Sequence, residues 1–140
     1  MAKLEIPEGC HGHDLQDLMY RFVNWFSLAN EKRDNLSYEL SQQEIYLELV
    51  EAEALLIVDK EIIENNEGRV SADIKKARAL IKPVVIDNNT TTLYEQKKIL
   101  AQKEYELNKM LSKVREIERL ISVCQSGLSF DRQEAAMPIK

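Results

Sequence analysis

The chain has 140 residues and a formal net charge of −5, and only 4 glycines and 3 prolines interrupt it. This length fits one domain and leaves no room for two with separate cores. Gly and Pro together normally supply about 12% of residues, whereas here they are seven of 140. Because residues that form turns are scarce, sandwiches, barrels and doubly wound sheets, which need frequent turns, are disfavoured. We therefore expect a single all-α domain.

Residues 1 to 13 contain no apolar run, and we expect this N-terminus to be flexible. It does not read as a secretory signal, and no stretch approaches the roughly 18 apolar residues of a membrane-spanning helix. Cys10 and Cys124 are then expected to be free thiols in a reducing compartment. These observations predict a soluble, cytoplasmic protein with no membrane partner.

Three potential zinc ligands, Cys10, His11 and His13, lie close together near the N-terminus. A structural zinc site needs a second, separated pair of ligands, and Cys124 is the only other cysteine or histidine. We therefore expect no metal and no cofactor, and a zinc-dependent enzyme is the least favoured hypothesis. P-loop, nucleophile-elbow and zinc-protease motifs are also missing from the sequence, which predicts a protein that is not an enzyme.

Residues 14 to 67 contain neither Gly nor Pro, which predicts one long helical region. Residues 30 to 35 (NEKRDN) either bend this region or continue its helix. An aromatic cluster precedes them at helical spacing: Tyr20, Phe22, Trp25 and Phe26. This spacing is typical of a core or an interface, although aromatic side chains can also stack on the bases of a single strand.

A heptad seam, in which apolar positions alternate at spacings of four and three, follows in the same region. Its members are Leu36, Leu40, Gln43, Leu47, Val50, Ala54 and Ile57. Residues 36 to 67 are also strongly acidic, with nine carboxylates against Lys60 for a net charge of −8. We expect one face of this segment to pack on another helix.

A short basic helix is predicted over residues 68 to 83, with Ser71 as its N-cap and Pro83 after its end. Its net charge of +4 over residues 68 to 82 comes from five bases against Asp73. Two interpretations stay open. These bases could contact a phosphate backbone, or they could neutralise the acidic segment before them. The candidate nucleic-acid-binding residues are Arg69, Lys75, Lys76, Arg78 and Lys82.

Residues 84 to 92 (VVIDNNTTT) read as an extended connector in which strand pairing is possible, and residues 93 to 128 predict a long heptad helix. Thr92 and Glu95 have the spacing of a capping box at its start, and Gly127 is placed to cap its end before a tail over residues 129 to 140. The predicted oligomer or packing seam of this helix is Leu93, Leu100, Leu107, Val114, Ile121 and Leu128.

The two seams can pair within one chain as a helical hairpin or between chains. In a two-helix pair each helix is covered on one side only, so the aromatic residues Phe22, Trp25 and Phe26 would need a further surface. We therefore expect the helical bundle to be completed by homo-oligomerisation.

The run GRVSADIKKARA, residues 68 to 79, follows an acidic helix, and a long charged helix ends in QSGLSFDR, residues 125 to 132. In this order of helices, in length and in acidic balance, residues 51 to 134 resemble the phage recombination mediators of the UvsY type. Pro83 and the following VVIDNNTTT depart from the more continuous helix expected of that family.

The resemblance implies a non-enzymatic, ring-forming protein of DNA recombination and repair that binds single-stranded DNA in the host cytoplasm. It would help a strand-exchange recombinase replace single-strand-binding protein on the strand. The alternative hypothesis is a helical interaction or structural module, such as a phage scaffold or an inhibitor of a host factor. That module would act through its coiled-coil seams without DNA.

Overall fold

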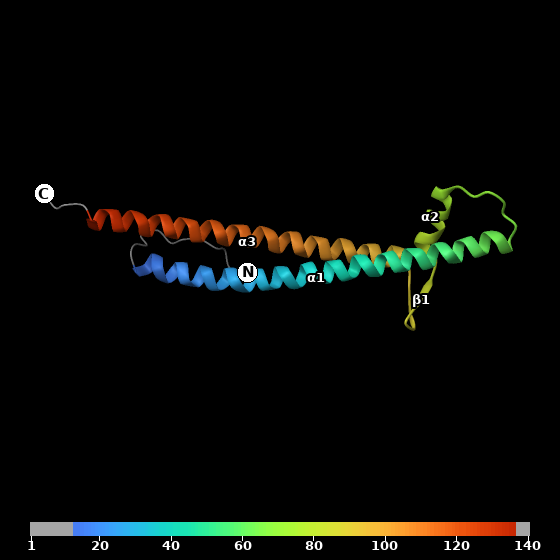
Figure 1. Ribbon diagram of the computed structural model, residues 1–140, viewed down its shortest axis with the longest axis horizontal. Coiled ribbons are helices and arrows are strands. Elements are labelled where there is room, and N and C mark those ends of the chain that lie inside the picture. Colours follow the sequence, from blue (N-terminus) through green and yellow to red (C-terminus); the bar gives the residue numbers. More distant parts are fainter. Residues whose placement is uncertain (1–12, 137–140) are drawn as a thin grey trace. The chain divides into compact units, whose positions relative to one another are not determined.

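The computed structural model describes the backbone of residues 13–136 and the side chains of residues 14–128. Three helices and one two-stranded hairpin follow one another in this part of the chain. They are α1 (His13–Glu64), α2 (Ala72–Ile81), β1 (Val84–Ile86), β2 (Asn89–Thr91) and α3 (Leu93–Ala136). The predicted all-α class, with two long helices forming a helical hairpin, is confirmed (Figure 1).

Helix α1 is continuous through residues 30–35. Of the two alternatives for this segment, a bend or a continuous helix, the structure shows the helix. It ends at Glu64, before the predicted limit at residue 67. Asn66 adopts φ 48°, and the amide of Glu67 donates to the carbonyl of Ile62 at 3.1 Å. This is the hydrogen-bond pattern of a Schellman cap, in which one left-handed residue closes the last turn.

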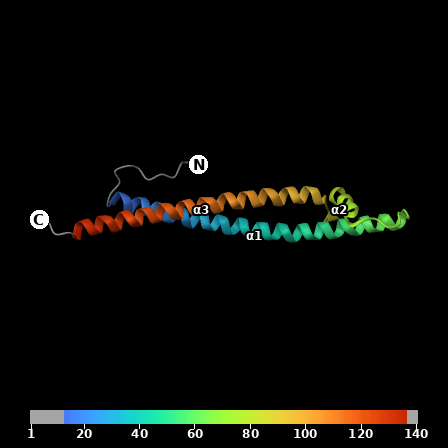
Figure 2. The same ribbon diagram turned by 90° about the horizontal axis from the view of Figure 1, so that it is seen from above.

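Contacts group the chain into two compact units, Met1–Asn35 with Leu107–Lys140 and Leu36–Glu106. We call them the terminal unit and the central unit. Each contains a segment of α1 beside a segment of α3, as both views show (Figures 1 and 2). The prediction that the chain is a single domain stays a prediction.

In the terminal unit, α1 and α3 bury an apolar face from each helix. Phe22 is 2% exposed, and its ring centroid lies 5.6 Å from that of Trp25. Gly127 allows a close approach, because a Cβ atom there would lie 2.8 Å from a methyl carbon of Leu15. The buried apolar residues of this unit are Leu15, Phe22, Ala29, Met110, Val114, Ile117, Leu120 and Cys124.

In the central unit, α2 and the β hairpin pack against the last part of α1. The side chains of Ala54, Val58 and Ile62 from α1 meet Ala79 of α2 and Val84 of β1 in one cluster. The hydroxyl of Ser71 accepts from the amide of Ile74 at 3.3 Å, so the predicted N-cap of α2 is confirmed.

The predicted extended connector contains a short antiparallel hairpin, in which Val84 pairs with Thr91 and Ile86 with Asn89. Asp87 and Asn88 form the two-residue turn at φ 49° and 67°. Positive φ at both positions is the requirement of a type I′ turn, which Asn and Asp tolerate better than most residues.

One of the two hydrogen bonds of the predicted capping box is present at the start of α3: the Thr92 hydroxyl accepts from the amide of Glu95 at 3.2 Å. The Glu95 carboxylate instead accepts from the Thr91 hydroxyl at 3.2 Å. Gly127 is not a C-cap, because α3 continues through it to Ala136, eight residues past the predicted end at residue 128. The close approach to Leu15 explains this glycine instead.

Candidate interaction surfaces

Three of the five candidate DNA-binding residues form ion pairs with acidic residues of the same unit. Lys75 Nζ lies 3.1 Å from an oxygen of Asp59, and Lys82 Nζ lies 2.7 Å from one of Glu61. The Arg78 guanidinium donates two hydrogen bonds to Glu67, at 2.8 and 2.7 Å. These contacts match the interpretation in which the basic helix neutralises the acidic segment.

The Arg78–Glu67 pair perturbs both of its groups. The hydrogen bonds from Arg78 lower the pKa of the Glu67 carboxyl below its ordinary value of 4.5. The same bonds raise the pKa of Arg78 above its ordinary value. Because this bidentate geometry fixes both partners, the pair holds α2 to the loop after α1.

The other two candidates, Arg69 and Lys76, are exposed and form no ion pair with any described residue. Lys76 lines a half-open cavity of about 160 Å³ in the central unit. The cavity is also lined by Glu51, Leu55, Ala79, Leu93 and Lys97.

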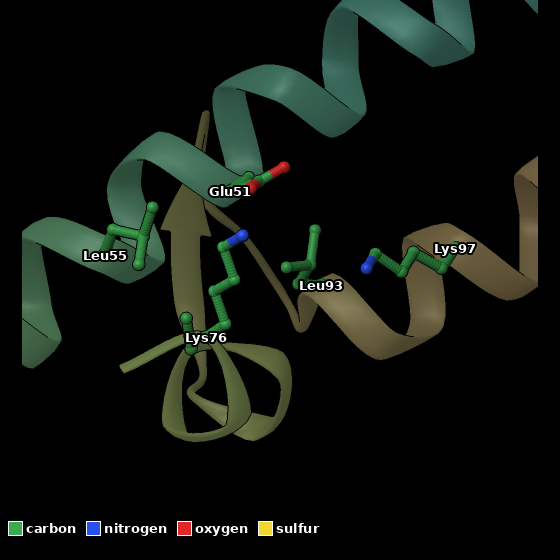
Figure 3. A pocket seen from close by; sticks show the side chains of 6 residues that line it. Glu51, Leu55, Lys76, Leu93 and Lys97 are labelled. Atoms are coloured by element: carbon green, nitrogen blue, oxygen red, sulfur yellow. The ribbon is translucent and has the colours of Figure 1, made fainter. Parts of the chain in front are cut away.

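Figure 3 shows Lys76 on α2 and Lys97 on α3 reaching toward this cavity from different helices, with Leu93 between them and Glu51 above. Two ammonium groups against one carboxylate leave the rim with an excess positive charge. This arrangement can hold one anionic group, such as a phosphate, over an apolar floor. The neighbouring Lys98 lies instead 5.0 Å from the centre of the Tyr94 ring.

A second apolar stripe on α1 is the largest feature that the sequence analysis missed. We call it the outward seam: Tyr38, Ile45, Leu49, Leu56 and Ile63, with exposed fractions of 67, 62, 46, 54 and 74%. At 3.6 residues per turn these five side chains fall within about 40° of arc. In the sequence these five residues recur at spacings of seven, four, seven and seven. The inner seam of the same segment has more members at closer spacing, so the sequence pattern indicated that seam instead.

The outward seam lies on the face of α1 opposite to the predicted heptad seam. The predicted seam is the inner one, with Val50 and Ala54 fully buried and Leu40 and Leu47 half-buried. One polar member, Gln43, donates to the side-chain oxygen of Gln96 on α3 at 2.7 Å. The central segment of α1 therefore carries apolar stripes on two opposite faces, and one of them is exposed.

Acidic side chains predominate at the borders of the outward seam. Glu48 lies on one side of it, and Glu53 and Glu64 lie on the other side together with Lys60. None of the three carboxylates forms an ion pair with a described residue, whereas Glu39 lies 3.6 Å from Lys103 of α3. Lys60 is the single base in α1 between residues 36 and 64.

The predicted seam of α3 is only in part buried. Leu93 and Val114 are buried, and the intervening and later positions Leu100, Leu107, Ile121 and Leu128 are half-buried. In the terminal unit, Met110, Ile117 and Cys124, which also recur every seven residues, are buried together with Leu120. The buried face of α3 there therefore includes the second core position of each heptad.

The aromatic cluster divides between core and surface. Phe22 is buried and Phe26 half-buried, whereas Trp25 is 40% and Tyr20 59% exposed. The N-terminal residues Cys10 and His11 and the side chain of His13 lie outside the described part. Within the described part, no group of three or more potential metal ligands occurs.

A scan against protein-family models, a search of curated proteins and a search of solved structures each found no match. Between residues 13 and 136, no helix has both the length and the apolar character needed to cross a bilayer.

Proposed function

We propose that this protein is a non-enzymatic helical binding module that docks a protein partner on the outward seam of α1. The observation that carries the proposal is the alignment of five large apolar side chains, 46–74% exposed, along one stripe. Contiguous exposed apolar surface of this kind marks interaction sites in proteins. Full burial of an exposed side chain of this size contributes about 1.5–3 kcal/mol, and covering the part of each that is still exposed would contribute a corresponding share to binding.

The outward seam also has the geometry that a helix recognises. Its members recur at intervals of seven, with one interval of four, so all five occupy core positions of a heptad repeat, which in a coiled coil meet a partner helix. The inner face of the same segment already packs within the central unit, where Val50, Ala54 and Val58 are fully buried. The exposed side chains are therefore available for binding without any change of fold.

The test replaces two central members of the outward seam, Leu49→Gln and Leu56→Gln, in the full chain. Its matched control carries Val23→Gln and Leu28→Gln, two exposed apolar positions of α1 outside the seam. Sedimentation velocity measures self-association, and quantitative mass spectrometry measures proteins retained from a cell lysate. The proposal expects the seam variant, and not the control, to lose a bound protein or a second copy. Equal retention and equal sedimentation by all three proteins would refute it.

A second candidate function is the single-stranded DNA-binding recombination mediator that the family resemblance implies. The observation in its favour is the pair Lys76 and Lys97, which reach one cavity without a carboxylate partner at ion-pair distance. One protomer offers few phosphate contacts in this way. A homo-oligomer that displays many copies would gain avidity along a strand, and a strand-exchange recombinase and single-strand-binding protein would be its further partners.

This candidate is tested by titrating a fluorescent oligonucleotide at several salt concentrations. For single strands the logarithm of affinity should fall with that of salt at about −0.7 per phosphate contacted. Lys76→Glu with Lys97→Glu should abolish binding, and Lys98→Glu on the neighbouring position is the matched control. If no binding is detected at low salt, the mediator function is excluded; if all variants bind alike, Lys76 and Lys97 are not the DNA-binding site.

A further inference from the structure

The charges beside the outward seam define the partner that it fits. We infer that the outward seam docks an amphipathic helix of another protein whose apolar stripe is bordered by lysines or arginines. This inference rests on the proposed function, because it assumes that the seam is a docking site. It adds the chemistry of the occupant.

The length of the seam sets the length of the partner. Tyr38 and Ile63 are separated by 25 residue steps, which at 1.5 Å per residue corresponds to about 38 Å of helix. A partner that covers all five side chains therefore needs about seven helical turns, with apolar residues at alternating spacings of three and four. A short loop or a single anchoring side chain would leave most of the stripe exposed.

Charged residues beside the stripe occupy the flanking positions that determine partner choice in coiled coils. Glu48 stands on one border, and Glu53, Lys60 and Glu64 stand on the other, so three carboxylates outnumber one ammonium group. Charged residues at such flanking positions attract opposite charges on the facing helix and repel like charges. Because none of these carboxylates forms an ion pair with a described residue, all three remain available to a basic partner.

The same charges disfavour two other occupants. Pairing the outward seam in parallel with the identical seam of a second copy would place Glu48 of one chain beside Glu53 of the other. An anionic bilayer would repel the acidic borders, whereas helices that lie on membranes normally carry Lys and Arg beside their apolar face. A basic amphipathic helix is complementary to the apolar stripe through its own apolar face and to the acidic borders through its positive charges.

The test uses the full chain and three synthetic 28-residue helical peptides. The first has an Ile/Leu heptad stripe with lysine borders, the second the same stripe with glutamate borders, and the third lysine borders with the stripe replaced by glutamine. Isothermal titration at low and high salt is run with the wild type, with Leu49→Gln/Leu56→Gln, and with the charge-reversed Glu48→Lys/Glu53→Lys/Glu64→Lys.

The lysine-bordered peptide should bind the wild type about tenfold more tightly than the glutamate-bordered one, and salt should reduce this ratio. The charge-reversed variant should invert the preference. Binding of the glutamine-stripe peptide as tight as that of the lysine-bordered one would overturn the inference, since charge alone would then explain it. Equal binding of the two apolar peptides would overturn the inferred partner and leave the proposed function standing. Identical isotherms for the wild type and Leu49→Gln/Leu56→Gln would overturn both.

Sedimentation of the wild type alone provides a separate outcome. Self-association that disappears in Leu49→Gln/Leu56→Gln would identify a second copy as the occupant of the seam. That result would contradict the inferred foreign helix, although it would agree with the proposed function. A monomer that binds the lysine-bordered peptide supports the inference.

Discussion

The Glu67 carboxylate is held by two charge-assisted hydrogen bonds from Arg78, at 2.8 and 2.7 Å. They lower its pKa in the folded state below the ordinary value of 4.5. A carboxylate with a lowered folded pKa stabilises the fold at pH values above its unfolded pKa, and this contribution is lost as the pH falls through the folded pKa. The pair should therefore stabilise the docked α2 at neutral pH and stop doing so in acid.

This prediction is checked by NMR titration of the Glu67 carboxyl in the wild type and in Arg78→Gln. The midpoint should lie below 4.5 in the wild type and move up toward 4.5 in the variant. In denaturant melts the wild type should be more stable than the variant at pH 7, and the gap should shrink below pH 4.5. A gap that widens in acid would contradict the assignment.

Gly127 is explained by its contact with Leu15, and a double-mutant cycle tests that explanation. Ala normally stabilises a helix interior by about 1 kcal/mol relative to Gly. With Leu15 present, the added Cβ atom would lie 2.8 Å from a methyl carbon, so Gly127→Ala should bring no gain. In the Leu15→Ala background it should stabilise by about 1 kcal/mol. Equal effects in both backgrounds, measured by urea unfolding, would show that the two residues do not touch.

For individual residues, the sequence predicted the helix caps that have a strong local signature and missed the cap that has none. Ser71 and Thr92 cap their helices as expected, since each precedes a charged first turn. The end of α1 was misplaced because an Asn at φ 48° closes the helix, and Gly68 was the more obvious breaker. The role of Gly127 depends on a residue more than 100 positions away, which local patterns do not reveal.

Between the long helices, a polar pair replaces apolar contacts at one layer of the central unit. Gln43 donates to the Gln96 side-chain oxygen at 2.7 Å, and Gln96 donates to the Thr91 hydroxyl at 2.9 Å. Gln96 is 8% exposed, so removing one partner leaves a buried amide group without its hydrogen bond. Such a loss costs about 1–3 kcal/mol.

We therefore expect Gln43→Ala to lower the free energy of unfolding by about 1–3 kcal/mol. Replacing both glutamines, as Gln43→Leu with Gln96→Leu, should cost less, because neither amide group is then left unpaired and the Thr91 hydroxyl keeps its hydrogen bond to Glu95. Chemical denaturation of the three proteins measures both effects. A loss in the double variant as large as that of Gln43→Ala, or larger, would contradict the pairing.

The elements themselves were predictable where a periodic signal was long. The 54-residue run without Gly or Pro predicted α1, and the seven-residue repeat predicted α3. The β hairpin was left as an open possibility, because three-residue strands carry little pattern. Its Asp87–Asn88 turn was the available signal.

On the scale of the whole molecule, the residues of the outward seam should contribute to binding but little to the free energy of unfolding. Its side chains are exposed in the folded chain, so polar replacements remove no core packing. Leu49→Gln with Leu56→Gln should therefore change the free energy of unfolding by no more than about 0.5 kcal/mol per position. Val58→Ala, at a position with no exposed surface, is the contrasting variant and should cost clearly more. Thermal melts followed by circular dichroism make this comparison, and equal losses would contradict it.

The candidate sites were less predictable than the fold because charge pairing depends on tertiary contacts. The sequence offered Lys75, Arg78 and Lys82 as candidate DNA-binding residues, yet they pair with Asp59, Glu67 and Glu61 in the folded chain. Lys97 entered no prediction, since it lies in a region of mixed charge and only the fold brings it to the cavity with Lys76. The outward seam was visible in the spacings and was overlooked.

The central claim is that the outward seam of α1 is a binding face, and NMR mapping tests it most directly. The ¹⁵N-labelled chain is titrated with the lysine-bordered helical peptide. Shift changes are expected at the amides of Ile45, Leu49 and Leu56, and they should vanish in Leu49→Gln/Leu56→Gln. Changes confined to other surfaces, or no changes at peptide concentrations that saturate the calorimetric signal, would contradict the account.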